Sequence, residues 1–254
     1  MKKTVLFWIL AVLITIASAV YQRMTGPTYP LSGTVNLDGQ EIKYKLERSQ
    51  ESSQNYLIEI NANDESISGI LFWKKHKSND EFTQVPMHGT KTLNAELPAQ
   101  KRLEKLDYYV QLSKGDNLVV IPNEKLVTIR FKDHVPLYIL IPHIFFMFFA
   151  MMLSTRTGLE FFNKKSNLEK LSLWTIISLF IGGFPLGFAM NGLAFGEMWG
   201  GWPFGNDVTD DKTQIAFIVW IIAFYLVKKN KFAKIAVLIA SLVMLAVYLI
   251  PHSV

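Results

Sequence analysis

Five apolar runs constrain the fold of this chain more than any other feature of its sequence. They cover residues 4–19, 135–153, 171–190, 213–227 and 232–250. A bilayer core about 30 Å thick needs about 20 helical residues, so the second, third and fifth runs are long enough to cross it. The fourth becomes long enough if its helix begins at Asp210 or Asp211, whose carboxylates suit a helix N-terminus. Its N-cap is then Thr209 or Asp207.

The distribution of charge predicts how these spans are oriented. Lys and Arg exceed Asp and Glu at residues 2–3, 155–170 and 228–234, whereas loop 191–212 has a net charge of −3. Residues 21–133 contain 15 basic and 15 acidic side chains. All basic clusters therefore fall on one side of a five-span path, as the positive-inside rule requires. We expect a multi-pass protein of the bacterial inner membrane with residues 21–133 outside, and no nucleic-acid partner.

Residues 1–20 allow two interpretations. Lys2 and Lys3, the apolar run and Ala17-Ser18-Ala19 fit a cleavable signal peptide, but the length of the run and Trp8 favour a retained transmembrane anchor. The predicted organisation continues with a connector at residues 21–30, an extracytoplasmic domain at 31–133 and a four-helix membrane domain at 134–254. The chain contains no cysteine, so disulfides and thiolates do not contribute.

The segment between the first two spans changes from apolar runs to alternation. Nine candidate strands cover residues 32–37, 41–48, 55–61, 68–75, 82–85, 90–96, 105–112, 117–121 and 125–131. Asp38-Gly39 and Lys114-Gly115-Asp116 each predict a hairpin. The pattern predicts an inserted all-β sandwich domain, in which His76 and His88 are solvated surface residues. The late part, residues 93–112, resembles immunoglobulin-like and fibronectin-type modules, and this resemblance implies a fold but no function.

His143 is the most unusual polar residue of the predicted spans. It follows Pro142 and lies nine residues past His134, about 13 Å deeper in a helix. An intramembrane histidine is a candidate functional residue, and Met147 and Met151 share its helical face. One interpretation is ligation of copper or haem iron; the other is packing with an interhelical hydrogen bond. Gly182-Gly183-Phe184-Pro185 in the next span predicts a kink and close backbone approach.

Residues 196–207, Gly-Glu-Met-Trp-Gly-Gly-Trp-Pro-Phe-Gly-Asn-Asp, form the predicted external loop before the fourth span. Residues 194–227 resemble the tryptophan-rich haem-handling segment of cytochrome c assembly membrane proteins. The resemblance implies that Trp199, Trp202 and Asp207 form a haem-binding segment before a helix that contains Trp220. Phe195 stands where that family has a tryptophan, and four residues are inserted before the aspartate. An interfacial tryptophan belt with an ordinary turn is the alternative.

The same resemblance implies that His134 and His252, which flank this loop at one membrane level, are the iron ligands. Arg23 lies just outside the first span, against the charge rule. One interpretation is a contact with lipid headgroups at the interface, and the other is an ion pair with an anionic ligand such as a haem propionate. The sequence has no nucleophile with a nearby base, so an enzyme is not favoured. The two hypotheses are therefore binding or handling of haem or a metal-containing cofactor at the outer face, and a non-catalytic assembly subunit whose sandwich docks a periplasmic partner.

Overall fold

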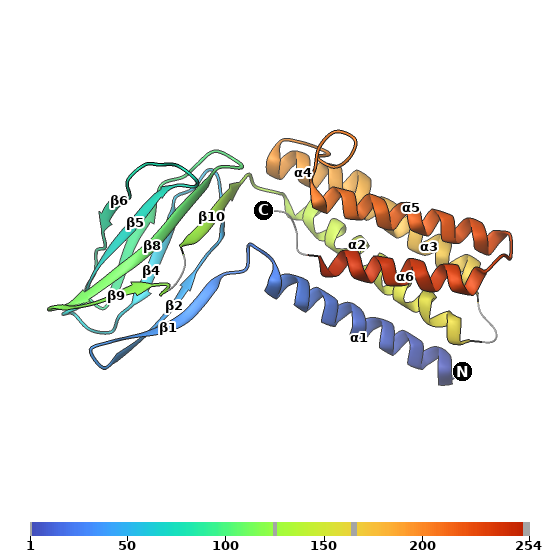
Figure 1. The fold of residues 1–254 in the computed structure, drawn as a ribbon, viewed down its shortest axis with the longest axis horizontal. Helices are drawn as coiled ribbons and strands as arrows, with labels where there is room; N and C mark the ends of the chain where they lie inside the picture. The colour runs from blue at the N-terminus through green and yellow to red at the C-terminus, as the bar shows by residue number, and fades with distance from the viewer. Residues whose placement is uncertain (1, 124–125, 164–166, 251–254) are drawn as a thin grey trace. The chain divides into compact units, whose positions relative to one another are not determined.

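The computed structural model describes residues 2–123, 126–163 and 167–250, and the chain divides into two compact units. The β unit is Thr28–His134, and the helical unit consists of the described residues before and after it (Figure 1). The β unit is thus inserted between the first and second helices of the helical unit.

The described residues of the helical unit form five long helices, and one of them changes its winding midway. They are α1 (Lys2–Thr25), α2 (Leu137–Leu159) with the 3-10 turn η1 (Glu160–Phe162), α3 (Leu168–Ile181) continued by the π-helical turn η2 (Gly182–Leu186) and α4 (Gly187–Phe195), α5 (Val208–Lys228) and α6 (Ala233–Leu249). Three segments are long and apolar enough to cross a membrane: Lys3–Thr25, Leu137–Phe162 and Leu168–Phe195. Helix α6 is apolar but shorter, at 17 residues.

The start of α5 confirms one of the two predicted caps. The Asp207 carboxylate accepts hydrogen bonds from the backbone N–H of Thr209 at 2.6 Å and of Asp210 at 3.4 Å. A carboxylate at this position satisfies helix-end donors and also interacts favourably with the helix dipole.

The glycine-rich part of the third long helix confirms the predicted close approach. The helix takes a π-helical turn at Gly182–Leu186, which contains Pro185. A methyl group on Gly183 would lie 2.6 Å from Cγ2 of Thr213 in α5. A larger residue at position 183 would force the Thr213 side chain to shift, so glycine favours the close packing of α5 here.

The core of the helical unit combines alanines with larger apolar side chains around one tryptophan. Trp220 of α5 is fully buried, and it packs in one cluster with Met151 of α2 and Met244 of α6. The cluster also contains Ala150, Leu168, Leu179, Ala216, Ala223, Val237, Ala240, Val247 and Tyr248. Small side chains let helices approach closely, as is common between helices in membranes.

The described residues of the β unit form ten strands. They are β1 (Leu31–Leu37), β2 (Gln40–Leu46), β3 (Ser49–Glu51), β4 (Tyr56–Asn61), β5 (Ser68–Lys75), β6 (Thr83–Pro86), β7 (Thr92–Leu97), β8 (Lys105–Lys114), β9 (Asn117–Ile121) and β10 (Val127–Lys132). All nine predicted strands are present with ends within two residues of the prediction, except that Lys125 lies outside the described residues. Strand β3 was not predicted.

Three sheets enclose one core. Strands β1 and β2 pair as the predicted hairpin around Asp38-Gly39, and β4 pairs with β7. The largest sheet has the order β3-β10-β8-β5-β6, and β9 pairs with β8 through the second predicted hairpin. Residues from all three sheets, such as Ile42, Ile58 and Tyr108, form one buried cluster. The Tyr108 hydroxyl donates to the Glu47 carbonyl at 2.8 Å, so this buried polar group is satisfied.

Candidate functional site

The tryptophan loop, residues 196–207, is tied to the N-terminal turn of α5 by two carboxylates. The backbone N–H of Gly200 donates to Asp210 Oδ2 at 2.7 Å, and that of Trp202 donates to Asp211 Oδ1 at 2.6 Å. The second oxygen of Asp210 accepts from Asn191 Nδ2 at 3.0 Å. Charge-assisted hydrogen bonds of this kind are the stronger ones, so the loop has a defined conformation.

The glycines of the loop are explained by its tight backbone. Gly196 ends α4 in the left-handed region with φ of 81°, where glycine is favoured. A Cβ on Gly205 would lie 2.2 Å from the carbonyl oxygen of Gly200, and one on Gly201 would lie 2.8 Å from Cβ of Asp210. The composition of the loop therefore reflects close packing of backbone against backbone.

The two tryptophans of the loop have different environments. The Trp199 ring stacks on Phe184 with centroids 5.7 Å apart and meets Phe188 edge-on at 5.5 Å. Its Nε1 donates to the Trp202 carbonyl at 3.3 Å. The Trp202 side chain is 68% exposed, and Phe204 is 82% exposed. Trp199 thus belongs to a half-buried aromatic stack, whereas Trp202 and Phe204 form an exposed apolar tip.

The structure places the other predicted cofactor ligands in separate settings. His134 belongs to the β unit, where its Nδ1 lies 2.7 Å from Glu51 Oε1. Arg23 lies in the last turn of α1. His252 lies outside the described residues, so its pairing with His134 across an iron atom stays a prediction. Among the described residues, no group of three His, Cys, Asp or Glu side chains could hold a metal ion.

His143 makes the interhelical hydrogen bond that one interpretation predicted. Its Nδ1 lies 2.9 Å from the Gly182 carbonyl in η2, and a carbonyl only accepts, so Nδ1 is protonated. Met147 also packs against Gly182, because the Met147 sulfur would lie 3.0 Å from a Cβ on that glycine. A metal-binding histidine is commonly oriented by such a bond from its other nitrogen. The arrangement thus satisfies packing and leaves ligation through Nε2 chemically feasible.

A buried ion pair near the end of α2 escaped sequence reasoning. Arg156 Nη2 lies 2.5 Å from Glu160 Oε1, and both side chains are almost fully buried. The guanidinium lies over the rings of Phe7 and Trp8 of α1, at 5.6 and 5.3 Å. Arg156 and Glu160 fell within the predicted cytoplasmic loop 155–170. Their spacing of four on one helical face was the available signal.

The prediction for His76 is wrong. Its Nδ1 lies 2.9 Å from Oδ1 of Asp107, a buried carboxylate that also accepts from the Thr128 hydroxyl at 2.6 Å. The three residues come from the end of β5 and from the adjacent strands β8 and β10. This cluster stabilises a carboxylate on the sheet, and sequence alone did not bring these distant residues together.

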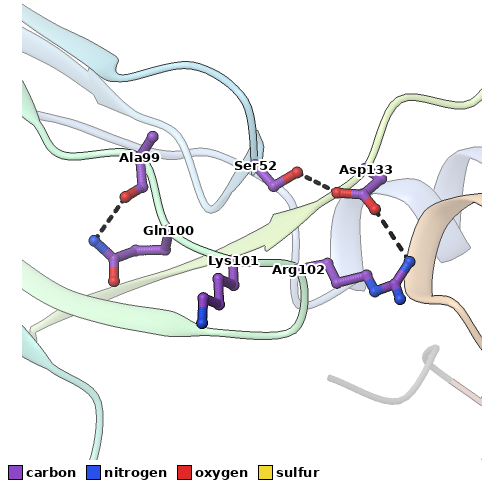
Figure 2. A pocket seen from close by; sticks show the side chains of 6 residues that line it. All are labelled: Ser52, Ala99, Gln100, Lys101, Arg102 and Asp133. Carbon is purple, nitrogen blue, oxygen red and sulfur yellow. Dashed lines mark hydrogen bonds and ion pairs between the residues drawn. The ribbon is translucent and has the colours of Figure 1, made fainter.

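An open pocket of about 630 Å³ lies in the β unit. It is lined by Ser52, Ala99, Gln100, Lys101, Arg102 and Asp133 (Figure 2). Asp133 accepts from the Ser52 hydroxyl and, at 3.3 Å, from Arg102 Nη1. Polar and cationic side chains dominate this lining, and they suit recognition of an anion better than of an apolar ligand.

Three aromatic rings form a patch on the largest sheet. This outer aromatic patch consists of Phe72, Phe82 and Tyr109. Phe72 and Tyr109 are stacked at 4.7 Å, and Phe82 meets Tyr109 edge-on at 5.2 Å. Their neighbours along the strands, Leu71 and Tyr108, are in the core. Successive side chains of a strand point to opposite faces, so the patch lies on the face away from the core.

No known family model matches this sequence, and the comparison with curated proteins gave no significant match.

Proposed function

We propose that this chain is a five-span protein of the bacterial inner membrane and serves as a non-catalytic assembly subunit whose extracytoplasmic β-sandwich docks a periplasmic partner. Three long apolar helices and an inserted β unit support membrane anchorage. The positive-inside distribution of Lys and Arg supports the orientation.

The outer aromatic patch carries the docking proposal. The core of the β unit is complete without these rings, and aromatic side chains are enriched at protein interfaces. Lys74 Nζ lies 5.0 Å from the centre of the Phe82 ring. We therefore propose a partner that covers the patch with apolar side chains and brings a carboxylate to Lys74.

The test is affinity purification of the full-length tagged protein from its native membrane. We expect a stoichiometric partner that is lost from the Phe72→Ala/Tyr109→Ala variant. The matched control is Leu57→Ala, because Leu57 is an exposed residue of β4 in another sheet and its variant should retain the partner. A partner retained equally by both variants would contradict docking at the patch.

A second candidate function, binding of haem or a copper ion, is favoured by one observation. The Nδ1 hydrogen bond from His143 to Gly182 is the kind that orients a metal-ligating imidazole. His143 and Met147 would hold the metal, and Trp199, stacked on Phe184 in the same helical segment, would supply an apolar wall. Bound haem would supply redox or ligand-binding chemistry.

Absorbance spectroscopy and metal analysis of the detergent-solubilised protein test this candidate. We expect a Soret band or stoichiometric copper that His143→Ala removes and His88→Ala retains. Colourless, metal-free protein from cells replete in both haem and copper would refute it.

A further inference from the structure

Cationic side chains gather at one end of the β unit, although the charges of residues 21–133 balance. This basic rim consists of Lys75, Lys77, Lys101, Lys105, Arg130 and Lys132. Three adjacent strands bring it together: Lys75 ends β5, Lys105 begins β8, and Arg130 lies opposite Lys105 on β10. The turn after β5 adds Lys77, and the loop before β8 adds Lys101.

The electrostatics of Lys105 show that these cations act on one another. Partial burial lowers its pKa, and the positive charges of Arg130 and Lys77 lower it further. Three carboxylates at this end already have partners: Asp107 contacts His76 and Thr128, Asp133 contacts Ser52 and Arg102, and Glu51 contacts His134. The rim therefore has a positive potential that an external anion can neutralise.

The opposite end of the β unit has the opposite character. There Lys114 is shared by Asp64 at 2.9 Å and Asp38 at 3.7 Å, and Asp116 lies in the adjacent turn. The net charge of the β unit is close to zero, but its charges are separated along the strands. Its orientation in an external field therefore matters more than its total charge.

Both chain connections leave the β unit at the end that bears the basic rim. Lys132 ends β10, and four residues separate it from Leu137 of α2, a reach of no more than about 18 Å. Five residues separate α1 from Leu31, which pairs with Leu46 at the end of β2. Strand β3 follows β2 directly and pairs with β10, with Ser49 opposite Arg130. The start of β1 therefore lies at the same end as Arg130. Since α1 and α2 are candidate membrane spans, short tethers limit how far this end can lie from a bilayer.

We propose that the basic rim binds the anionic headgroups of phospholipids in the extracytoplasmic leaflet. This interaction surface is independent of the outer aromatic patch, and it fits a phosphate-bearing membrane surface, which attracts Lys and Arg within a Debye length. The pocket lined by Lys101 and Arg102 lies at the same end and adds donors for a headgroup phosphate (Figure 2).

The chain has no cysteine, so single cysteines can carry a fluorophore without background labelling. Leu103→Cys reports from the rim, and Leu118→Cys, an equally exposed leucine beside the β8–β9 turn, reports from the opposite end. The full-length protein is placed in nanodiscs that contain a headgroup nitroxide quencher, with either neutral lipid alone or added phosphatidylglycerol.

We expect phosphatidylglycerol to increase quenching at position 103 and to leave position 118 unchanged. About 1 M NaCl, where the Debye length is about 3 Å, should abolish the increase. Lys75→Gln/Lys77→Gln/Lys101→Gln should reduce the ratio of docked to undocked protein about fivefold per lysine. The control Lys43→Gln/Lys91→Gln removes exposed lysines elsewhere and should change nothing.

Two outcomes would overturn the proposal. Quenching at position 103 that is equal in neutral and anionic bilayers would show that headgroup charge is not recognised. Inorganic phosphate that abolishes the increase when NaCl of the same ionic strength does not would assign the rim to a small soluble anion instead of a lipid.

Discussion

The buried pair Arg156–Glu160 gives the sharpest prediction for the helical unit. Glu160→Leu removes the carboxylate and leaves a guanidinium that is 3% exposed without its counter-ion. Its Nε and Nη1 already lack hydrogen-bond partners among the described residues. Because an uncompensated buried charge is costly, we expect the free energy of unfolding of the helical unit to fall by about 3–5 kcal/mol.

The double variant Arg156→Met/Glu160→Leu separates this cost from ordinary packing. It removes both charges while keeping apolar volume, and such replacements change stability little or raise it. We therefore expect the double variant to lie within about 1 kcal/mol of the native protein, with a large coupling energy in the double-mutant cycle.

The assay is reversible unfolding in mixed detergent micelles, with SDS as the denaturant and helical circular dichroism as the signal. Asn163, which donates to Glu160 Oε2 at 2.9 Å, supplies a control, because Asn163→Ala should cost only about 1 kcal/mol. If Glu160→Leu costs no more than Asn163→Ala, or if the double variant is as unstable as the single one, the pair is not held by charge compensation and the reasoning is refuted.

Three further predictions follow from individual contacts. Gly205→Ala should expose the tryptophan loop to hydrogen exchange, because its methyl group would lie 2.2 Å from the Gly200 carbonyl, whereas Gly187→Ala, at an ordinary 3.5 Å, should not. Hydrogen bonds from the Ser66 side chain lower the pKa of Asp64. The ionised carboxylate should therefore stabilise the fold above about pH 4 and lose that effect as the pH falls towards its lowered pKa. Melting curves of Asp64→Asn should show a weaker acid dependence than those of the native protein. The intact mass of the purified protein should include α1, whose aromatic rings cover Arg156; a mass without residues 1–19 would support the signal-peptide interpretation.

The β unit could be predicted from the sequence where its signals were local. Alternation of apolar and polar residues located nine strands, and Asp38-Gly39 located a hairpin because its residues adopt positive φ. Strand β3 has only three residues and pairs in parallel with β10, far along the chain. Nothing in three residues specifies a distant parallel partner, so its formation depends on the finished fold.

In the helical unit, too, polar contacts between residues close in sequence could be predicted, and contacts that depend on the tertiary fold could not. Asp207 could be recognised as a cap because capping depends on residues two and three positions ahead. The hydrogen bonds that Asp210 and Asp211 accept from loop amides could not be recognised, because they depend on the path of the loop. Arg156 and Glu160 were taken as solvated loop charges, since hydropathy weighs each residue singly and does not register that two opposite charges neutralise each other.

The tryptophan loop shows why composition alone could not distinguish a membrane belt from a cofactor wall. Both roles need flat apolar rings next to a flexible backbone, so both predict the same residue types. The structure divides the two rings: Trp199 completes a stack with Phe184, while Trp202 stays exposed with Phe204. A flat ligand could therefore use Trp202 directly, whereas one face of Trp199 is already occupied by Phe184. Trp202→Ala should consequently weaken binding of such a ligand without destabilising the helical unit, whereas Trp199→Ala should lower its stability whether or not a ligand binds.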